Sequence, residues 1–315
     1  MTTAVVISAL VGIAAGGIAY FWATTLTRRG VDTGNVIRTS ILAACGWGIF
    51  SGLLYAGLAY AVLEAGWQTT PDQHLSSTAL PSRLVFHGTL LFFLLTATIT
   101  DFRDYVIPDW ITVPGMLLGI IGLTAAGHVD LAPIWVDWYN PLPTPQPPQV
   151  PDFVRETPHW HGLAVSIAGL LVGGGVVWLA RAACSTIAGR DGLGFGDVTL
   201  MAMAGAFLGW QPVLLAIAIA PLTGIVVALA VAVSGLRSYI AFGPYLACGC
   251  VVVLLTWKFI WVAPIRDLMG DAIGMAVLGG LIAAISVGML LLLRGYHSIP
   301  VLNAPRSADG ELGDE

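Results

Sequence analysis

Residues 192–200 read G-L-G-F-G-D-V-T-L, and they place one carboxylate, Asp197, at the start of an apolar segment that continues to Trp210. Gly192, Gly194 and Gly196 alternate before it, which allows the backbone to turn tightly and to approach a neighbouring element. An ionisable side chain at the edge of hydrocarbon costs free energy unless it is neutralised, hydrated or used. We therefore treat Asp197 as a candidate functional residue and expect it to have a partner elsewhere in the chain.

A second segment carries the same kind of signal. Residues 100–109 read T-D-F-R-D-Y-V-I-P-D, in which Asp101 ends one apolar run and Asp109 begins the next. Asp101 and Asp197 thus belong to two different apolar segments. This pair of carboxylates is the core of the functional hypothesis.

Composition indicates a polytopic membrane protein. Hydrophobic residues make up 57% of the chain, charged residues 10%, and the mean hydropathy is +0.85, which excludes an ordinary soluble domain. Apolar segments of about twenty residues can satisfy their backbone in lipid only as helices. We predict an all-α bundle of about eight to nine transmembrane spans, with apolar runs at residues 4–26, 41–63, 84–100, 110–127, 162–183, 197–211, 212–235, 245–263 and 272–293.

Residues 197–235 form the ambiguous region, because they fit either one long bent helix or two spans divided at Gln211-Pro212. The positive-inside rule favours two spans, since nine of the 13 basic residues then share one side. The predicted protein is a multi-pass protein of the cytoplasmic (inner) membrane, with its N-terminus outside and its C-terminus in the cytoplasm. The nine residues are Arg28, Arg29, Arg38, Arg103, Arg181, Arg190, Arg237, Arg294 and Arg306.

The predicted organisation has four parts: a two-helix membrane segment (1–66), a catalytic core (67–263), an additional C-terminal transmembrane helix (264–293) and a disordered cytoplasmic tail (294–315). The segment 128–160 is acidic and proline-rich, so we expect an exported loop of irregular structure. At its end, His159 and His161 are expected to be interfacial residues, because no third metal ligand lies near them in the sequence.

Two carboxylates that share a site can hold one proton between them and act in turn as base and acid on a bound water. This arrangement hydrolyses a peptide bond without a metal or a nucleophilic side chain. The sequence contains no H-E-x-x-H, G-x-S-x-G or Walker-type motif, and the four cysteines form no C-x-x-C pair. We therefore predict neither a cofactor nor a metal. Scattered basic residues argue against nucleic-acid binding.

The motifs resemble those of the type IV prepilin peptidases, which are membrane aspartic proteases of the GxGD kind. The similarity lies in Asp101 with Ile107-Pro108-Asp109, in the glycine run with Asp197 and residues 205–210, and in Phe242-Gly243-Pro244. It covers roughly residues 84–263. The resemblance implies that Asp101 and Asp197 are the catalytic pair and that the other motif residues support them. It also implies a prepilin or pseudopilin substrate whose short basic leader is removed at the cytoplasmic face.

Two departures from the family pattern affect the predicted activity. Thr199 stands where family members commonly carry a lysine, so a cation near Asp197 is missing from that position. The bifunctional members carry cysteine motifs in the loop after the first helix, whereas residues 27–40 contain no cysteine. We therefore expect peptidase activity without N-methylation of the new N-terminus. The ninth span is an addition to the family pattern.

Several of these residues also have a structural interpretation. Asp109 is expected to cap the fourth helix rather than to take part in catalysis. Gly205 and Gly209 are expected to allow close helix packing, and Phe242-Gly243-Pro244 to shape the start of the eighth span. The alternative function is a transporter or channel that uses Asp101 and Asp197 as an ion or proton relay, although no inverted repeat is visible. A catalytically inactive assembly factor is a third interpretation. The sequence does not reveal the natural substrate or the oligomeric state.

Overall fold

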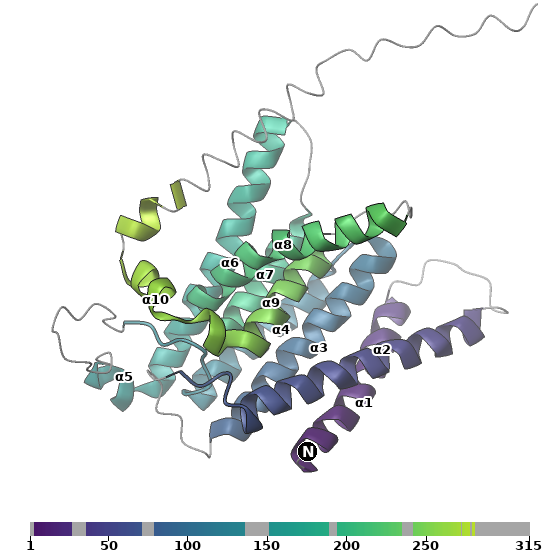
Figure 1. Cartoon of the computed structure of the whole chain (residues 1–315), viewed down its shortest axis with the longest axis horizontal. Coiled ribbons are helices and arrows are strands. Elements are labelled where there is room, and N and C mark those ends of the chain that lie inside the picture. The colour runs from purple at the N-terminus through teal and green to yellow at the C-terminus, as the bar shows by residue number, and fades with distance from the viewer. Residues whose placement is uncertain are drawn as a thin grey trace, which may run out of the picture.

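The computed structural model describes residues 3–26, 36–70, 79–135, 151–188, 194–234, 242–271, 273–277 and 279–280. This part of the chain is helical and contains no strand, which confirms the predicted all-α membrane bundle (Figure 1). Six of its helices are long and apolar enough to cross a bilayer, and two shorter apolar helices accompany them. The elements are α1 (Thr3–Leu26), α2 (Val36–Ala59), the π-helical turn η1 (Tyr60–Glu64), α3 (Leu80–Asp104), α4 (Asp109–Ala126), α5 (Asp152–Glu156), α6 (Pro158–Ala188), α7 (Phe195–Leu208), α8 (Trp210–Ser234), α9 (Gly243–Ile260) and α10 (Ala263–Gly270).

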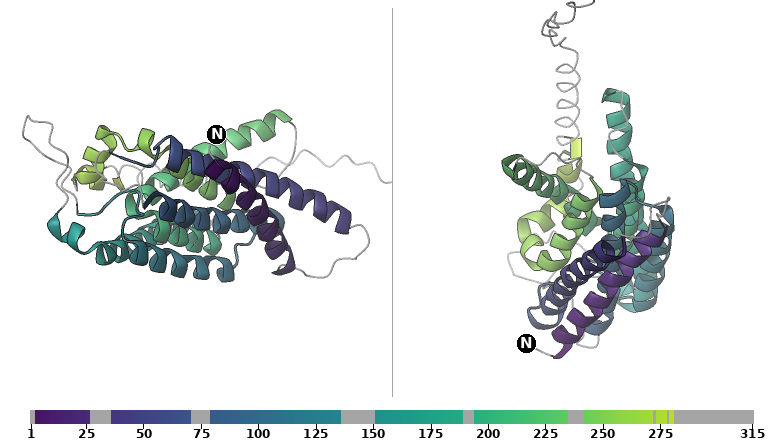
Figure 2. Two further views of the ribbon diagram at one scale, coloured as in Figure 1. Left: turned by 90° about the horizontal axis from the view of Figure 1, so that it is seen from below. Right: turned by 90° about the vertical axis from the view of Figure 1, so that its right-hand side faces the viewer.

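The first two helices form a hairpin at one side of the bundle (Figures 1 and 2). Their axes approach closely because glycines line the contact: a Cβ added to Gly12 would lie 2.7 Å from the Cβ of Tyr55. The hydroxyl of Tyr55 donates a hydrogen bond to the carbonyl of Gly88 (2.6 Å), which fastens α2 to α3.

α7 lies at the centre of the bundle and packs against α3, α4, α6, α8 and α9. Almost every residue from Asp197 to Leu208 is buried, as expected for a helix that is apolar on all sides. Gly205 meets the backbone of Gly169 in α6 and leaves no room for a Cβ, which confirms the predicted packing role of Gly205.

The ambiguous region is resolved into two helices, but the predicted break at Gln211-Pro212 is wrong. The break lies at Gly209, whose φ of +85° strongly favours glycine and ends α7. Pro212 lies in the first turn of α8, where a proline is tolerated because the first N–H groups of a helix have no intrahelical partner.

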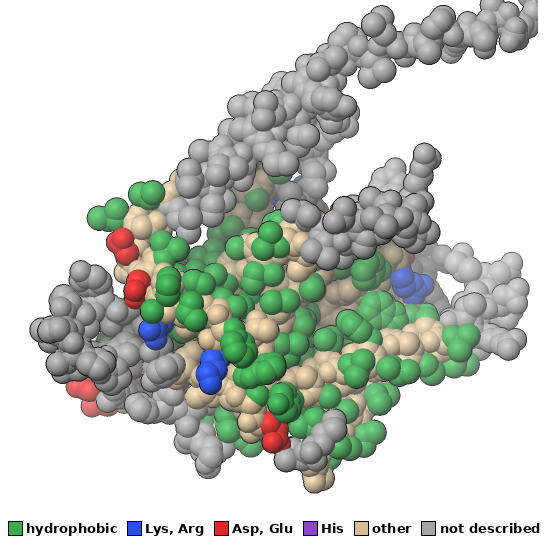
Figure 3. Space-filling view, in the orientation of Figure 1, with side chains coloured by type: hydrophobic (Ala, Val, Ile, Leu, Met, Phe, Trp, Pro, Cys, Tyr) green, Lys and Arg blue, Asp and Glu red, His purple; other side chains and the backbone are tan. Residues whose placement is uncertain are grey.

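The segment predicted to be irregular over residues 128–160 contains one short helix, α5, and α6 begins at Pro158, four residues before the predicted start. The proline-rich run at 141–148 lies outside the described residues. Most of the predicted span at 272–293 and all of the predicted tail at 294–315 do so as well; α10 precedes them as a separate short helix. In the space-filling view, hydrophobic side chains predominate on the visible face and charged ones are few, in agreement with a membrane environment (Figure 3).

Candidate active site

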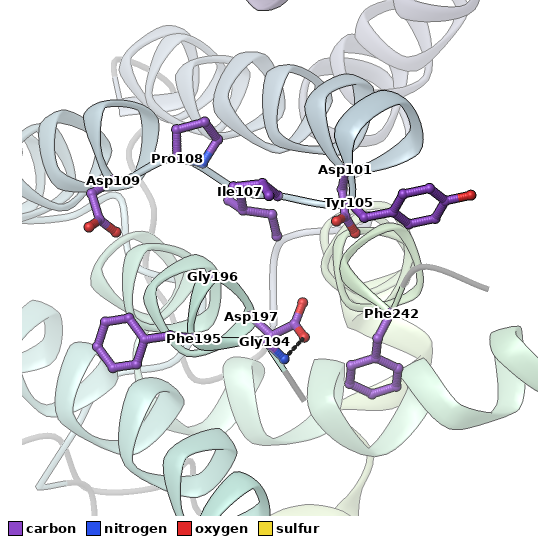
Figure 4. Close-up of a pocket in the computed structure, with 11 residues that line it drawn as sticks. Asp101, Tyr105, Ile107, Pro108, Asp109, Gly194, Phe195, Gly196, Asp197 and Phe242 are labelled. Carbon is purple, nitrogen blue, oxygen red and sulfur yellow. Dashed lines mark hydrogen bonds between the residues drawn. The ribbon is translucent and has the colours of Figure 1, made fainter. Parts of the chain in front are cut away.

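Asp101 and Asp197 face one pocket from two helices (Figure 4). Asp101 lies in the last turn of α3 and Asp197 in the first turn of α7. Each residue is only 7% exposed, yet both line this pocket. The two carboxylates are near enough for their charges to interact.

The start of α7 fixes the carboxylate of Asp197. Gly194 is the N-cap residue, and its N–H donates a hydrogen bond to Oδ2 of Asp197 (3.3 Å). This is the returning half of a capping box, in which the third helical residue reaches back to the cap. The partial positive charge at a helix N-terminus also favours a carboxylate at this position. The glycine run therefore both starts the helix and orients the acid.

Gly196 is required by a close approach from the connection between α3 and α4. Tyr105 ends α3 with φ = 53°, a left-handed conformation that is uncommon for a residue with a side chain. The connection then crosses the start of α7, and a Cβ on Gly196 would lie 2.9 Å from the Cβ of Ile107. Gly192, the first glycine of the motif, lies outside the described residues.

The third motif approaches from α9. Phe242 is the N-cap residue of this helix and lines the pocket, Gly243 is its first residue, and Pro244 follows in the first turn. Gly243 lies directly against the carboxylate of Asp101. The pocket is thus assembled from three segments that are distant in the sequence.

The pocket has a volume of ≈ 510 Å³ and an apolar rim. Tyr105, Val106 and Phe195 on this rim are more than half exposed, so they are available for contact with another molecule. These three residues were not predicted from the sequence; their positions beside the two aspartate motifs were the available signal. The lining residues are Asp101, Tyr105, Val106, Ile107, Pro108, Asp109, Gly194, Phe195, Gly196, Asp197 and Phe242.

Asp109 lies on the far side of the pocket from Asp101 (Figure 4). The prediction that it caps α4 is wrong, because Pro108 is the N-cap residue and Asp109 is the first helical residue. A proline with extended backbone fits the cap position, and a negative charge in the first turn is favoured by the helix dipole. Asp109 is exposed, in contrast to the two buried aspartates.

Thr199 has a structural role at the position where the family commonly has a lysine. The hydroxyl of Thr199 donates a hydrogen bond to the carbonyl of Gly196 (3.1 Å), so it reinforces the first turn of α7. Among the described residues, Arg181 in α6 contributes a positive charge that acts weakly on Asp197. This role of Arg181 was not predicted, because the residue is far from the motif in the sequence.

The histidines of the predicted exported loop have different environments. His161 is buried, and its Nε2 accepts a hydrogen bond from the N–H of Ile134 (3.1 Å). The expectation that it is an interfacial residue is therefore wrong: the ring fastens residues 128–135 to α6. His159 is exposed and contacts the carbonyl of Thr124. Within the described residues, no three potential metal-ligating side chains gather at one place.

Comparisons with known proteins show that part of this chain is similar to leader peptidases. Residues 154–229, which include Asp197 but not Asp101, match the Type IV leader peptidase family. The chain is 31% identical over 169 residues to the prepilin leader peptidase/N-methyltransferase of Escherichia coli (strain K12), an alignment that covers 52% of this chain and 61% of that protein. It is 28% identical over 169 residues to the protein of the same name from Pseudomonas putida, covering 52% and 48%.

The chain therefore spans about half the length of the curated relatives that it matches. No solved structure matches it. The family resemblance predicted from the sequence is confirmed over the aligned part of the chain.

Proposed function

We propose that this protein is a membrane-embedded aspartic endopeptidase that removes the short basic leader from type IV prepilins or pseudopilins at the cytoplasmic face of the membrane. The observation that carries the proposal is that Asp101 and Asp197, buried at the ends of α3 and α7, face one pocket. Their positions agree with the two motifs that resemble the family, and the similar proteins named above are prepilin leader peptidases.

In the proposed mechanism, the two carboxylates share one proton and hold a water molecule between them. The ionised carboxylate takes a proton from the water as it attacks the scissile carbonyl, and the protonated one supports the developing oxyanion and supplies the proton that the leaving amine needs. Burial lowers the effective dielectric, so the single charge of the pair acts strongly on the substrate. The apolar rim formed by Tyr105, Val106 and Phe195 would hold the extended segment around the scissile bond.

The test is cleavage of a prepilin by the purified full-length protein in lipid. Asp101→Asn and Asp197→Asn should each abolish removal of the leader, and the double variant should be no worse, because either change disables the unit. Asp104→Asn is the matched control, since Asp104 is an exposed aspartate one turn after Asp101 on the same helix. Appreciable processing by either single variant at wild-type amounts of folded protein would contradict the dyad.

We also propose that the protein cleaves without a metal and does not methylate its product. The relatives, in contrast, are named for both leader peptidase and N-methyltransferase activity. The chain has four cysteines and no C-x-x-C pair, so the cysteine motifs linked to methylation in the family are missing. Mass spectrometry with S-adenosylmethionine present should show a product lighter by its leader alone, and a chelator should leave cleavage intact. A methyl group on the new N-terminus, or inhibition by chelator that zinc reverses, would overturn this part.

A further inference from the structure

The first turn of α9 leaves one backbone N–H group, that of Gly243, without a backbone acceptor among the described residues. The N–H groups of Tyr245 and Leu246 are both accepted by the carbonyl of Phe242 (3.0 and 3.3 Å). Pro244 has no N–H. The amide of Gly243 is therefore the N–H of this first turn that no backbone carbonyl accepts within the described part of the chain. A free amide at a helix start is a ready donor to an anion.

The carboxylate of Asp101 lies beside Gly243. A Cβ added to Gly243 would lie 2.5 Å from Oδ2 of Asp101 and 3.2 Å from its Cγ, so the backbone of Gly243 lies directly against this group. Oδ2 is buried and forms no hydrogen bond of regular geometry with the described residues. Among the described residues, the amide of Gly243 is a backbone donor within reach of the Asp101 carboxylate. An incomplete hydrogen bond of this kind commonly tightens only in the substrate complex.

Each of the two carboxylates thus lies against the backbone amide of a glycine. Oδ2 of Asp197 accepts from the amide of Gly194 at the start of α7, and the Asp101 carboxylate lies against the amide of Gly243 at the start of α9. In both cases the donor belongs to a glycine at a helix N-terminus. The difference is that Gly194 has room for a Cβ, which would lie 3.6 Å from Oδ2 of Asp197, whereas Gly243 has none.

We propose that Gly243 is a positioning residue for catalysis: its missing side chain lets the start of α9 press against Asp101, and its amide holds the carboxylate of Asp101 toward Asp197. This inference rests on the proposed function. A Cβ at position 243 would take the space of the Asp101 carboxylate, so only glycine fits there. Pro244 contributes by removing a competing donor from the same turn.

A merely structural role for Gly243 makes a different prediction, and Gly249 supplies the comparison. Gly249 lies in the same helix, where a Cβ would collide with the carbonyl of Ala216 in α8, away from the pocket. Gly243→Ala should lower kcat on the order of 100-fold with KM unchanged, as expected for a displaced catalytic group. Gly249→Ala should reduce the amount of folded protein and leave kcat per folded molecule near that of the wild type. Wild-type kcat in Gly243→Ala would overturn the inference.

Thermal unfolding in detergent tests the contact without any substrate. Gly243→Ala should lower the Tm of the wild type, because the new Cβ and the Asp101 carboxylate compete for one space. In an Asp101→Ala background, most of this loss should disappear, since the carboxylate is gone and only the mobile end of Ile107 must move. An equal loss of Tm in both backgrounds would overturn the proposal. Failure of every variant and the wild type to cleave a prepilin would instead refute the proposed function and leave this coupling measurable.

Discussion

Each end of α3 buries a residue that can carry a charge, and the two ends differ in the hydrogen bonds that this residue makes. Arg83 lies near the start of the helix and is fully buried, and Asp101 lies about 27 Å further along it, from 18 residues at 1.5 Å each. The guanidinium of Arg83 donates to the carbonyls of Gln68 (2.8 Å) and Asp130, and the charge of Asp130 acts on it. Oδ2 of Asp101 has no hydrogen-bond partner within the described residues.

The polar residues around Arg83 hold connecting segments against the helices. We refer to Arg83, Gln68, His87 and Asp130 as the Arg83 clasp. His87 Nδ1 contacts Oε1 of Gln68 (2.9 Å), and Nε2 of Gln68 donates to the carbonyl of Leu254 in α9 (2.8 Å). Gln211 donates to the carbonyl of Pro133, and His161 accepts from Ile134, so the segment before α5 is held by α6 and α8. These polar groups satisfy backbone that would otherwise be buried without partners.

The difference between Arg83 and Asp101 suggests a way to tell residues that stabilise the fold from residues that act in the site. Removing one member of a buried charged cluster destabilises the fold, because its partners stay buried and lose their interaction. A buried ionisable group with few partners costs stability, so its position at a pocket makes it a candidate for chemistry. Substitutions at the two ends should therefore differ in sign as well as in size.

The largest effect on stability is expected at Arg83. Arg83→Met keeps most of the side-chain volume but removes the donor to the Gln68 and Asp130 carbonyls and the positive charge that acts beside Asp130. The free energy of unfolding should fall by about 3–5 kcal/mol, because each buried carbonyl that loses its donor costs about 1–3 kcal/mol. Chemical denaturation in detergent measures it, with Arg103→Met as the control, because Arg103 is exposed in the last turn of the same helix. Equal losses in the two variants would show that the Arg83 end is not a clasp.

A smaller effect is expected where His161 holds the preceding loop. His161→Ala removes the acceptor of the Ile134 N–H and the ring contact with Trp135, so unfolding should become easier by about 1–3 kcal/mol. Hydrogen exchange should rise in residues 129–135 and remain unchanged at the start of α7. His159→Ala, at an exposed histidine of the same turn, should leave both regions protected. Faster exchange at the start of α7 would mean that the loop held by His161 and the site around Asp101 and Asp197 are not independent.

At the other end, Asp101→Asn should keep or raise stability while it abolishes cleavage. Oδ2 of Asp101 is buried and has no hydrogen bond of regular geometry with the described residues, and an amide of the same shape removes the charge while it keeps an oxygen for the Gly243 amide, so a gain of up to about 1 kcal/mol is expected, as is common for substitutions that relieve a functional site. Thermal unfolding of Asp101→Asn beside Asp104→Asn measures this. A clear loss of stability in Asp101→Asn alone would contradict the view that the charge is kept for function.

The sequence predicted the helical bundle well, because apolar composition and span length have few other solutions in lipid. It misplaced the break between α7 and α8 by about two residues: an evenly apolar helix has no periodic pattern, and only the backbone geometry at Gly209 identifies the break. Proline was a misleading signal at Pro212 and Pro108, since it is tolerated at helix starts. The catalytic roles of Asp101 and Asp197 remain predictions.

The clasp around Arg83 could not be predicted, because its polar partners are backbone carbonyls, which no sequence pattern marks. The same reason hides the contact between Gly243 and Asp101. Glycine motifs indicate a close approach but not which group approaches, so residues 142 positions apart in the chain, Asp101 and Gly243, required coordinates to be paired.

The smallest effect is expected at the position where the family commonly has a lysine. Arg181 already provides a positive charge that acts on Asp197, so Thr199→Lys should change the cleavage rate by less than about fivefold, the range of a partly exposed charge pair. Arg181→Gln should slow cleavage to a similar extent, and adding Thr199→Lys to that variant should restore the rate. The guanidinium of Arg83 is fixed by direct hydrogen bonds to carbonyls. The positive charge that acts on Asp197 works only through its charge, so it can come from α6, as Arg181 does, or from a lysine at position 199 in α7. Rates of the four proteins, measured with one prepilin at equal amounts of folded enzyme, decide the question. A more than tenfold gain in Thr199→Lys alone would show that Arg181 does not take the place of the missing lysine.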